Sequence, residues 1–79
     1  MEYSYQQLVE DLHIGHEIEF LFSNKKYSFS NNESGWFLTV FGEEQYQSFC
    51  SVSSLLEQGR IEGKSIEEIW IYVNVTSIF

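Results

Sequence analysis

The chain has 79 residues, the size of a single domain with one hydrophobic core, so we expect residues 1–79 to form one domain. Its net charge of −8, from 12 acidic and 4 basic side chains, opposes direct binding to nucleic-acid phosphates, which needs clustered lysines and arginines, so we expect no direct nucleic-acid partner. Cys50 is the one cysteine, which excludes an internal disulfide, and since no membrane span or signal peptide is visible, we expect a cytoplasmic protein.

The first predicted element is a helix over about 5–13. Ser4 and Gln7 have the spacing of a capping box, in which a hydroxyl and an amide bind the backbone N–H groups that a helix start leaves unpaired. Gly15 is the expected stop, because glycine readily adopts the left-handed conformation of a helix end. The residues at helical spacing, which form one apolar stripe, are Tyr5, Leu8, Val9 and Leu12.

Residues 17–41 alternate apolar and polar side chains, which is typical of half-buried strands. We predict three strands in an antiparallel meander, with 27–30 in the middle and with turns at 24–25 and 31–34. The apolar positions are Ile18, Phe20, Phe22, Tyr27, Phe29, Trp36, Leu38 and Val40. The first helix is expected to cover this aromatic face.

These turns also predict the register of the strands. They would place Phe22 opposite Tyr27 and Phe29 opposite Trp36, because each step away from a turn advances one residue on both strands. In this register all the apolar positions named above lie on one face, and a slip by one residue would divide them between both faces.

The segment after the meander is harder to interpret. Residues 45–49 are compatible with a fourth strand at the edge or with an irregular crossing. Ser51 is the expected N-cap of a short helix over about 52–58 that ends at Gly59, and Ile61 is expected in the core. The apolar stripe of that helix consists of Val52, Leu55 and Leu56.

A last helix is predicted over about 66–73, where Ser65 and Glu68 form a second capping box. Its C-terminal part is rich in β-branched and aromatic residues, so early fraying is expected, with 73–79 either paired as a strand or loosely packed. Ile78 and Phe79 are expected to dock on this domain or to meet another chain. The predicted fold class is therefore α+β, a three-stranded antiparallel meander over about 17–41 with one N-terminal and two short C-terminal helices.

The residues that could carry chemistry form no convincing site. His13 and His16 are three apart, but Gly15 is expected to end the helix between them, so we interpret both as surface residues near a helix end. No orienting motif accompanies Cys50, which is expected to be a small buried thiol. The adjacent acid pairs at 10–11, 43–44 and 67–68 point apart rather than across a cleft. We expect no enzyme, no metal site and no cofactor.

The face of the meander that points away from the core is the better candidate for function. In the predicted register it carries Glu17, Glu19, Leu21, Ser28, Phe37, Thr39 and Phe41, of which Glu17, Glu19, Leu21, Phe37, Thr39 and Phe41 are the proposed interaction residues. One alternative is that the tail 73–79 covers this face. The other is a protein-binding or homodimer surface with aromatic anchors and an acidic rim.

Four stretches carry a resemblance to proteins of a known context: HEIEF at 16–20, NKKYS at 24–28, GWFL at 35–38 and IEGKSIEEIW at 61–70. With them the chain resembles small uncharacterised proteins of Gram-positive bacteria and their phages or mobile elements. The resemblance implies no catalytic or binding motif. It implies a context in which small acidic proteins often bind and block another protein, including nucleases of host defence.

Two functions are therefore expected ahead of catalysis. The first is a protein-binding module, in particular an inhibitor of a basic, nucleic-acid-handling protein, whose carboxylates would form a contiguous acidic face. The second is a structural or regulatory homodimer with no role related to nucleic acids. The net charge alone does not decide between them, because excess carboxylates also keep a small aromatic-rich domain soluble.

Overall fold

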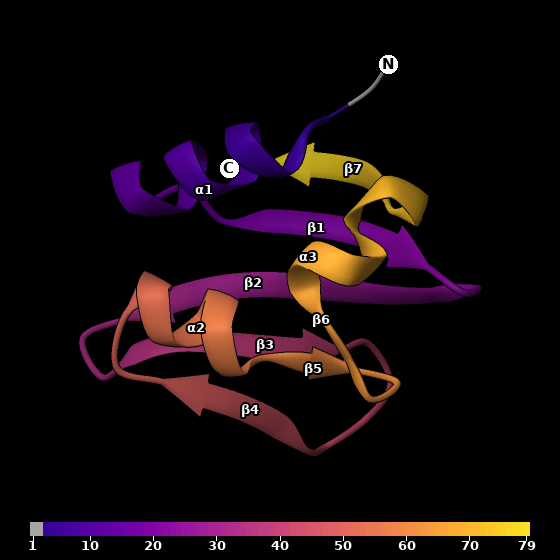
Figure 1. Ribbon diagram of the computed structural model, residues 1–79. Coiled ribbons are helices and arrows are strands. Elements are labelled where there is room, and N and C mark those ends of the chain that lie inside the picture. Colours follow the sequence, from indigo (N-terminus) through magenta and orange to yellow (C-terminus); the bar gives the residue numbers. More distant parts are fainter. Residues whose placement is uncertain (1–2) are drawn as a thin grey trace.

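The computed structural model describes residues 3–79 and shows an α+β fold (Figure 1). The elements in chain order are α1 (Tyr5–Ile14), β1 (Ile18–Phe22), β2 (Lys25–Asn32), β3 (Gly35–Val40), β4 (Tyr46–Phe49), α2 (Val52–Gln58), β5 (Arg60–Ile61), β6 (Lys64–Ser65), α3 (Ile66–Ile69), the 3-10 helix η1 (Trp70–Tyr72) and β7 (Asn74–Ile78). Five strands form one antiparallel sheet in the order β4-β3-β2-β1-β7, and β5 pairs with β6 as a separate hairpin.

The sheet is larger than the predicted three-stranded meander. β1, β2 and β3 are the expected strands, and β2 is the central one as predicted. β4 occupies the segment 45–49 that the sequence left open and pairs with β3, whereas β7 occupies the tail and pairs with β1. The last pairing joins segments more than fifty residues apart, so no local pattern in the sequence reveals it.

The first predicted register is wrong by two residues. The turn between β1 and β2 is at Ser23 and Asn24, with φ of 54° and 65°, so Phe20 rather than Phe22 lies opposite Tyr27. Such a two-residue hairpin turn needs positive φ at both central positions, which Asn accepts more readily than Lys25. Because side chains alternate with a period of two, the shift leaves every side chain on its predicted face.

The second turn also differs from the prediction. Asn32 pairs with Gly35, so the loop is shorter than the expected 31–34, and Phe29 lies opposite Leu38 rather than Trp36. The side chain of Asn32 accepts a hydrogen bond from the backbone N–H of Ser34 at 2.7 Å, which stabilises the tight turn. This shift is again by two residues and preserves the faces.

Local signals in the sequence predicted the helix starts and the end of α1 correctly. Ser4 and Gln7 form the capping box of α1, and Gly15 ends the helix with φ of 112°. Ser65 and Glu68 form the capping box of α3 in the same way. The predicted helix over 66–73 is shorter than expected, because α3 ends at Ile69 and continues as η1, after which the β-branched tail forms a strand.

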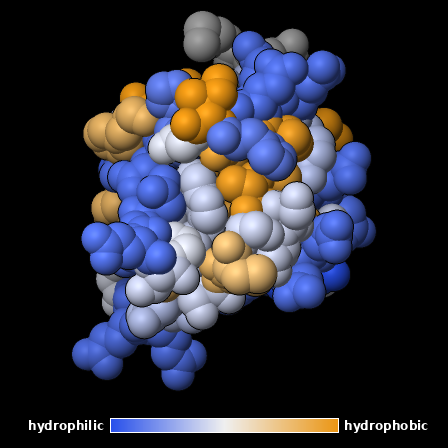
Figure 2. Space-filling view, turned by 90° about the vertical axis from the view of Figure 1, so that its left-hand side faces the viewer, coloured by the Kyte–Doolittle hydropathy of each residue, from blue (hydrophilic) through white to orange (hydrophobic). Residues whose placement is uncertain are grey.

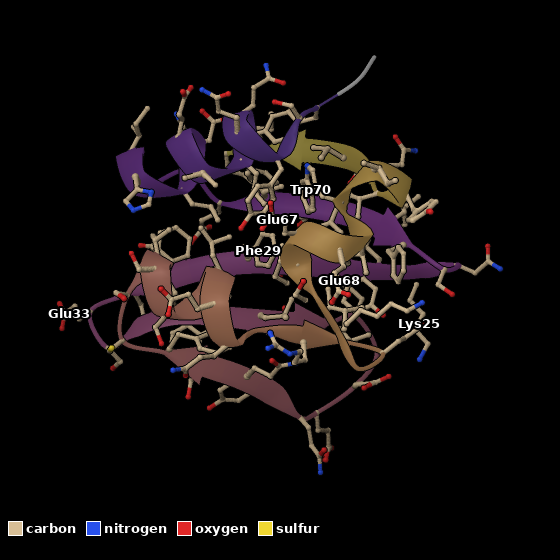
Figure 3. All side chains as sticks on the ribbon, in the orientation of Figure 1. Lys25, Phe29, Glu33, Glu67, Glu68 and Trp70 are labelled. Carbon is tan, nitrogen blue, oxygen red and sulfur yellow. The ribbon has the colours of Figure 1, made fainter. Side chains whose placement is uncertain are left out.

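The helices and the predicted apolar face of the sheet share one core. Its buried residues are Leu8, Leu12, Ile18, Phe20, Tyr27, Phe29, Leu38, Val52, Leu55, Ile61, Ile66, Ile69 and Trp70. The ring of Phe20 lies 4.9 Å from that of Phe29 and 5.3 Å from that of Trp70, between centroids. Figure 3 shows Phe29 and Trp70 in the interior, and the indole Nε1 of Trp70 donates to the carbonyl of Tyr3 at 2.9 Å. This bond fixes the start of the described chain on the core.

Candidate functional site

The helices cover one face of the sheet and leave the other uncovered within residues 3–79. In Figure 1, α2 and α3 lie in front of the sheet and α1 runs along its upper part. The side chains of the opposite face are absent from the core cluster. We call this surface the outer face and define it by the side chains of Glu19, Leu21, Lys26, Ser28, Ser30, Phe37, Thr39, Phe41, Tyr46 and Ser48.

The tail does not cover the outer face, which rejects one of the two alternatives expected from the sequence. β7 lies beside β1 in the plane of the sheet, with Leu21 opposite Asn74 and Glu19 opposite Ser77. The backbone of Phe79 forms two hydrogen bonds with that of Glu17, of 2.8 and 3.3 Å. The tail therefore widens the sheet instead of covering it.

The strand registers arrange the outer face, together with Asn74 and Ser77 of β7, in transverse rows. One row consists of Asn74, Leu21, Lys26 and Phe41, because the backbone N–H of Phe41 continues the pairing of β3 with Lys26. The next row consists of Ser77, Glu19, Ser28, Thr39 and Tyr46, and beside it Phe37 faces Ser48. Residues from five strands, remote in sequence, thus form one continuous surface.

Lys26 links the apolar and acidic parts of this surface. Its Nζ lies 3.2 Å from a carboxylate oxygen of Glu19 and 4.9 Å from the ring centroid of Phe41. A cation held over an aromatic face and beside a carboxylate is attracted by both groups. The charges of Lys26 and Glu19 cancel locally, so the middle of the outer face is close to neutral.

Two further contacts order the side chains of the outer face. The hydroxyls of Ser28 and Thr39 lie 2.6 Å apart and share a hydrogen bond. The rings of Phe37 and Tyr46 meet edge to face, with centroids 5.6 Å apart. The side chains of Phe41 and Tyr46 are 51% and 61% exposed, so both aromatic rings present apolar area to solvent on the outer face.

The structure thus brings together five of the six predicted interaction residues. Glu19, Leu21, Phe37, Thr39 and Phe41 all lie on the outer face. Glu17 differs, because its carboxylate accepts the backbone N–H of Asn31 at 3.0 Å and caps the end of β2.

Four residues of the outer face were not predicted from the sequence: Lys26, Ser30, Tyr46 and Ser48. The alternation around Tyr27 already implies that Lys26 points outward. Tyr46 and Ser48 could not be assigned, because β4 itself was uncertain.

The two histidines are held apart by different partners. Nδ1 of His13 donates to the carbonyl of Val9 at 2.8 Å within α1, and Nδ1 of His16 donates to the carbonyl of Phe79 at 2.9 Å. Within residues 3–79 no group of three or more His, Cys, Asp or Glu side chains has a metal-binding arrangement.

Cys50 is exposed, so the prediction of a buried thiol is wrong. It follows β4 directly, where the chain leaves the sheet toward α2, and its side chain reaches no core position. With His13 and Trp36 it lines a shallow groove of about 600 Å³ at the side of the molecule seen in Figure 2, where apolar patches lie among polar residues. No described hydrogen bond links Cys50 to either histidine.

A second groove, of about 510 Å³, lies between the start of α1 and η1. Its lining includes Tyr5, Glu67 and Trp70. Burial, and secondly the negative charge of Glu67, raises the pKa of the Tyr5 phenol above its ordinary value.

The chain matches no protein-family model, no curated protein and no solved structure. Among the described residues, no helix has the length and hydropathy needed to cross a membrane. The function of the outer face is therefore inferred from the geometry of its own residues.

Proposed function

We propose that this chain is a non-enzymatic protein-binding module and that the outer face is its contact surface. The observation that supports this most directly is the uncovered sheet face with Phe41 and Tyr46 exposed. Buried interface centres are enriched in aromatic residues, and a contiguous aromatic patch on a small domain typically marks a contact site. Leu21 and Phe37 add further apolar area, and the other outer-face groups are small hydroxyls and the Glu19–Lys26 ion pair, whose burial a partner compensates with hydrogen bonds of its own.

The chemistry of the partner follows from where charge lies on this surface. Glu19 contacts Lys26, so the centre of the outer face favours an apolar contact. Two carboxylates lie at the ends of the sheet, Glu33 at one end in Figure 3, opposite Lys25, and Glu44 in the turn between β3 and β4, whereas those of the helices lie on the other side of the sheet. We propose a partner with an apolar patch flanked by basic groups, so that the acidic ends increase the association rate.

The proposed partner class is a basic, nucleic-acid-handling protein that this chain inhibits, as in the context that the sequence resemblance implies. The net charge of −8 supports it. A mimic of nucleic acid would need carboxylates spread over the contact surface, whereas the outer face carries only Glu19 within its rows. In the form proposed here, aromatic contacts supply affinity and the rim carboxylates supply selectivity.

Site-specific photo-crosslinking in the cells that produce the protein tests the proposal. Benzoylphenylalanine replaces Phe41 or Tyr46, aromatic for aromatic, and Ser53 serves as the control because it is exposed on α2, away from the outer face. We expect the same protein to be captured from positions 41 and 46 and not from 53. Capture from 53 alone, or none from 41 and 46, would contradict the assignment.

The captured partner then allows a quantitative test. Phe37→Ala removes one ring of the edge-to-face pair with Tyr46 and is expected to weaken binding by about tenfold, or about 1.4 kcal/mol. A basic partner whose association slows at high salt supports the inhibitor role, because salt screens the rim carboxylates. An unchanged dissociation constant for Phe37→Ala would contradict the outer face as the contact.

The second candidate function is a structural or regulatory homodimer. The exposure of Leu21 and Phe41 favours it, because two copies could cover each other's outer faces. This arrangement predicts a dimer that Phe37→Glu converts to a monomer.

A further inference from the structure

β7 is an edge strand whose outer side has no partner within residues 3–79. It is the terminal strand of the sheet and pairs only with β1. Glu17 and Phe79 exchange both backbone hydrogen bonds, and bonded and non-bonded pairs alternate along an antiparallel ladder. The N–H and C=O of Ile78 therefore point away from β1, toward the free edge.

The composition of this edge differs from that of the rest of the chain. Residues 69–79 contain no acidic, basic or histidine side chain, although the chain carries a net charge of −8. Natural edge strands are usually protected by lysine, by proline or by bulges. Of these devices β7 has only a bulge, opposite Glu19 and Phe20. The side chains of β7 itself therefore bring no like charges together when two copies meet along this edge.

The other edge of the sheet is protected. β4 has four residues, and Glu43 and Glu44 lie just before it. The side chain of Gln47 also ties β4 to the backbone of Arg60. A short strand that begins beside two carboxylates offers little edge for pairing, so β4 is less suited to self-pairing than β7.

Exposed apolar side chains lie at both ends of β7. Ile71 and Tyr72 precede the strand, and Ile78 and Phe79 lie at its end, with Ile71 82% and Phe79 65% exposed. Antiparallel pairing of two β7 strands places the beginning of one beside the end of the other. Ile71 and Tyr72 of one copy then lie beside Ile78 and Phe79 of the other. Because the dimer is symmetric, this apolar contact occurs at both ends of the paired strands.

We propose that β7 is the contact strand of a symmetric dimer, in which it pairs antiparallel with β7 of a second copy of this chain. The strand is suited to this by its β-branched residues, Val75, Thr76 and Ile78. A two-fold axis perpendicular to the sheet keeps both outer faces on the same side, so the dimer has one continuous sheet with two adjacent outer faces. This dimer does not depend on the binding function proposed above.

Sedimentation equilibrium of the full chain tests the dimer, with Ile78→Lys as the variant and Phe41→Lys as its control. The two side chains are similarly exposed, at 45% and 51%, and both substitutions add one positive charge. We expect the unmodified chain to be dimeric at high micromolar concentration. Ile78→Lys should weaken association at least about tenfold, while Phe41→Lys leaves it nearly unchanged.

Three results would overturn the inference: a monomeric unmodified chain, a dimer insensitive to Ile78→Lys, or dissociation caused by Phe41→Lys alone. The last would indicate self-association through the outer face instead. If Ile78→Lys does not fold, hydrogen exchange of the unmodified chain replaces it. The amide of Ile78 should then exchange more slowly at high than at low protein concentration, and equal rates would contradict the dimer. None of these measurements involves the outer-face partner, so the two proposals fail separately.

Discussion

The side chain of Gln47 forms two hydrogen bonds with the backbone of Arg60. Its Nε2 donates to the carbonyl at 2.6 Å, and its Oε1 accepts the N–H at 3.0 Å. A primary amide has the same donor and acceptor as a peptide group. The Gln47 side chain therefore binds the Arg60 backbone as a neighbouring strand would, and it connects β4 to the β5-β6 hairpin. β4 carries Tyr46 of the outer face, so the contact also supports the candidate site.

Loss of this contact should lower stability in a graded way. Gln47→Ala is expected to lower the free energy of unfolding by about 1 kcal/mol, because water replaces the lost partners of an exposed backbone. Gln47→Glu should cost about 2 kcal/mol, since a carboxylate cannot donate to the Arg60 carbonyl and repels it. Urea denaturation measures both values.

Gln45→Ala is the matched control for this prediction. Gln45 is exposed, and its side chain has no hydrogen bond among the described contacts, so its removal should change stability by less than about 0.5 kcal/mol. Equal losses at both positions would show that the double hydrogen bond contributes nothing specific.

Two glycines with positive φ separate backbone strain from steric overlap. A Cβ on Gly35, at φ of 134°, would overlap the carbonyl oxygen of Phe49, whereas a Cβ on Gly42, at φ of 89°, would meet nothing within 4 Å. Gly42→Ala should therefore cost about 1 kcal/mol from the left-handed conformation alone. Gly35→Ala should cost about 2–4 kcal/mol, because β4 must also move.

Thermal or urea unfolding of both alanine variants checks this difference. Since Gly35→Ala displaces β4 from β3, it should also broaden the NMR signals of Tyr46 in the folded protein. Equal losses for the two glycine variants would mean that β4 moves aside freely.

The carboxylate of Glu68 predicts a pH dependence of stability. It accepts the backbone N–H of Ser65 at 2.8 Å, and this bond, with the Ser65 hydroxyl next, lowers the pKa of Glu68 below its ordinary value. A pKa that is lower in the folded than in the unfolded chain means that ionised Glu68 stabilises the fold above the ordinary carboxyl pKa. That stabilisation is lost as the pH falls through the folded pKa.

Urea unfolding between about pH 6 and about pH 3 should thus show a steeper loss for the unmodified chain than for Glu68→Gln. Glutamine keeps the capping bond but does not titrate. Glu67→Gln is the control, because Glu67 occupies the same exposed first turn without such a bond. Parallel pH profiles for the unmodified chain and Glu68→Gln would rule out this effect.

The alternation of residues 17–41 predicted the two faces of the sheet but not the register. The registers of both hairpins are shifted by two residues from the prediction. The predicted faces are preserved, because the side-chain period of a strand is also two. Burial of Phe20, Phe29 and Leu38 is therefore predicted in either register. The turn positions depend on which residues accept positive φ. That conformational preference contributes less free energy than the burial of the aromatic rings.

Exposure outside the periodic elements was not predictable in the same way. Cys50 is a small apolar residue in a segment without clear period, and it is exposed because the chain leaves the sheet there. The candidate site was predicted where the strands were clear, and its β4 residues were missed where they were not.

By itself the sequence determined the capped helix starts and the inward and outward faces of the meander, because these depend on residues only a few positions apart in the chain. The excess of negative charge follows directly from its composition. Only the tertiary structure decided where the tail lies. Pairing of β7 with β1 closes a loop of more than fifty residues, and its free energy comes from contacts that no local pattern contains. That pairing leaves the outer face uncovered and gives the sheet its uncharged edge.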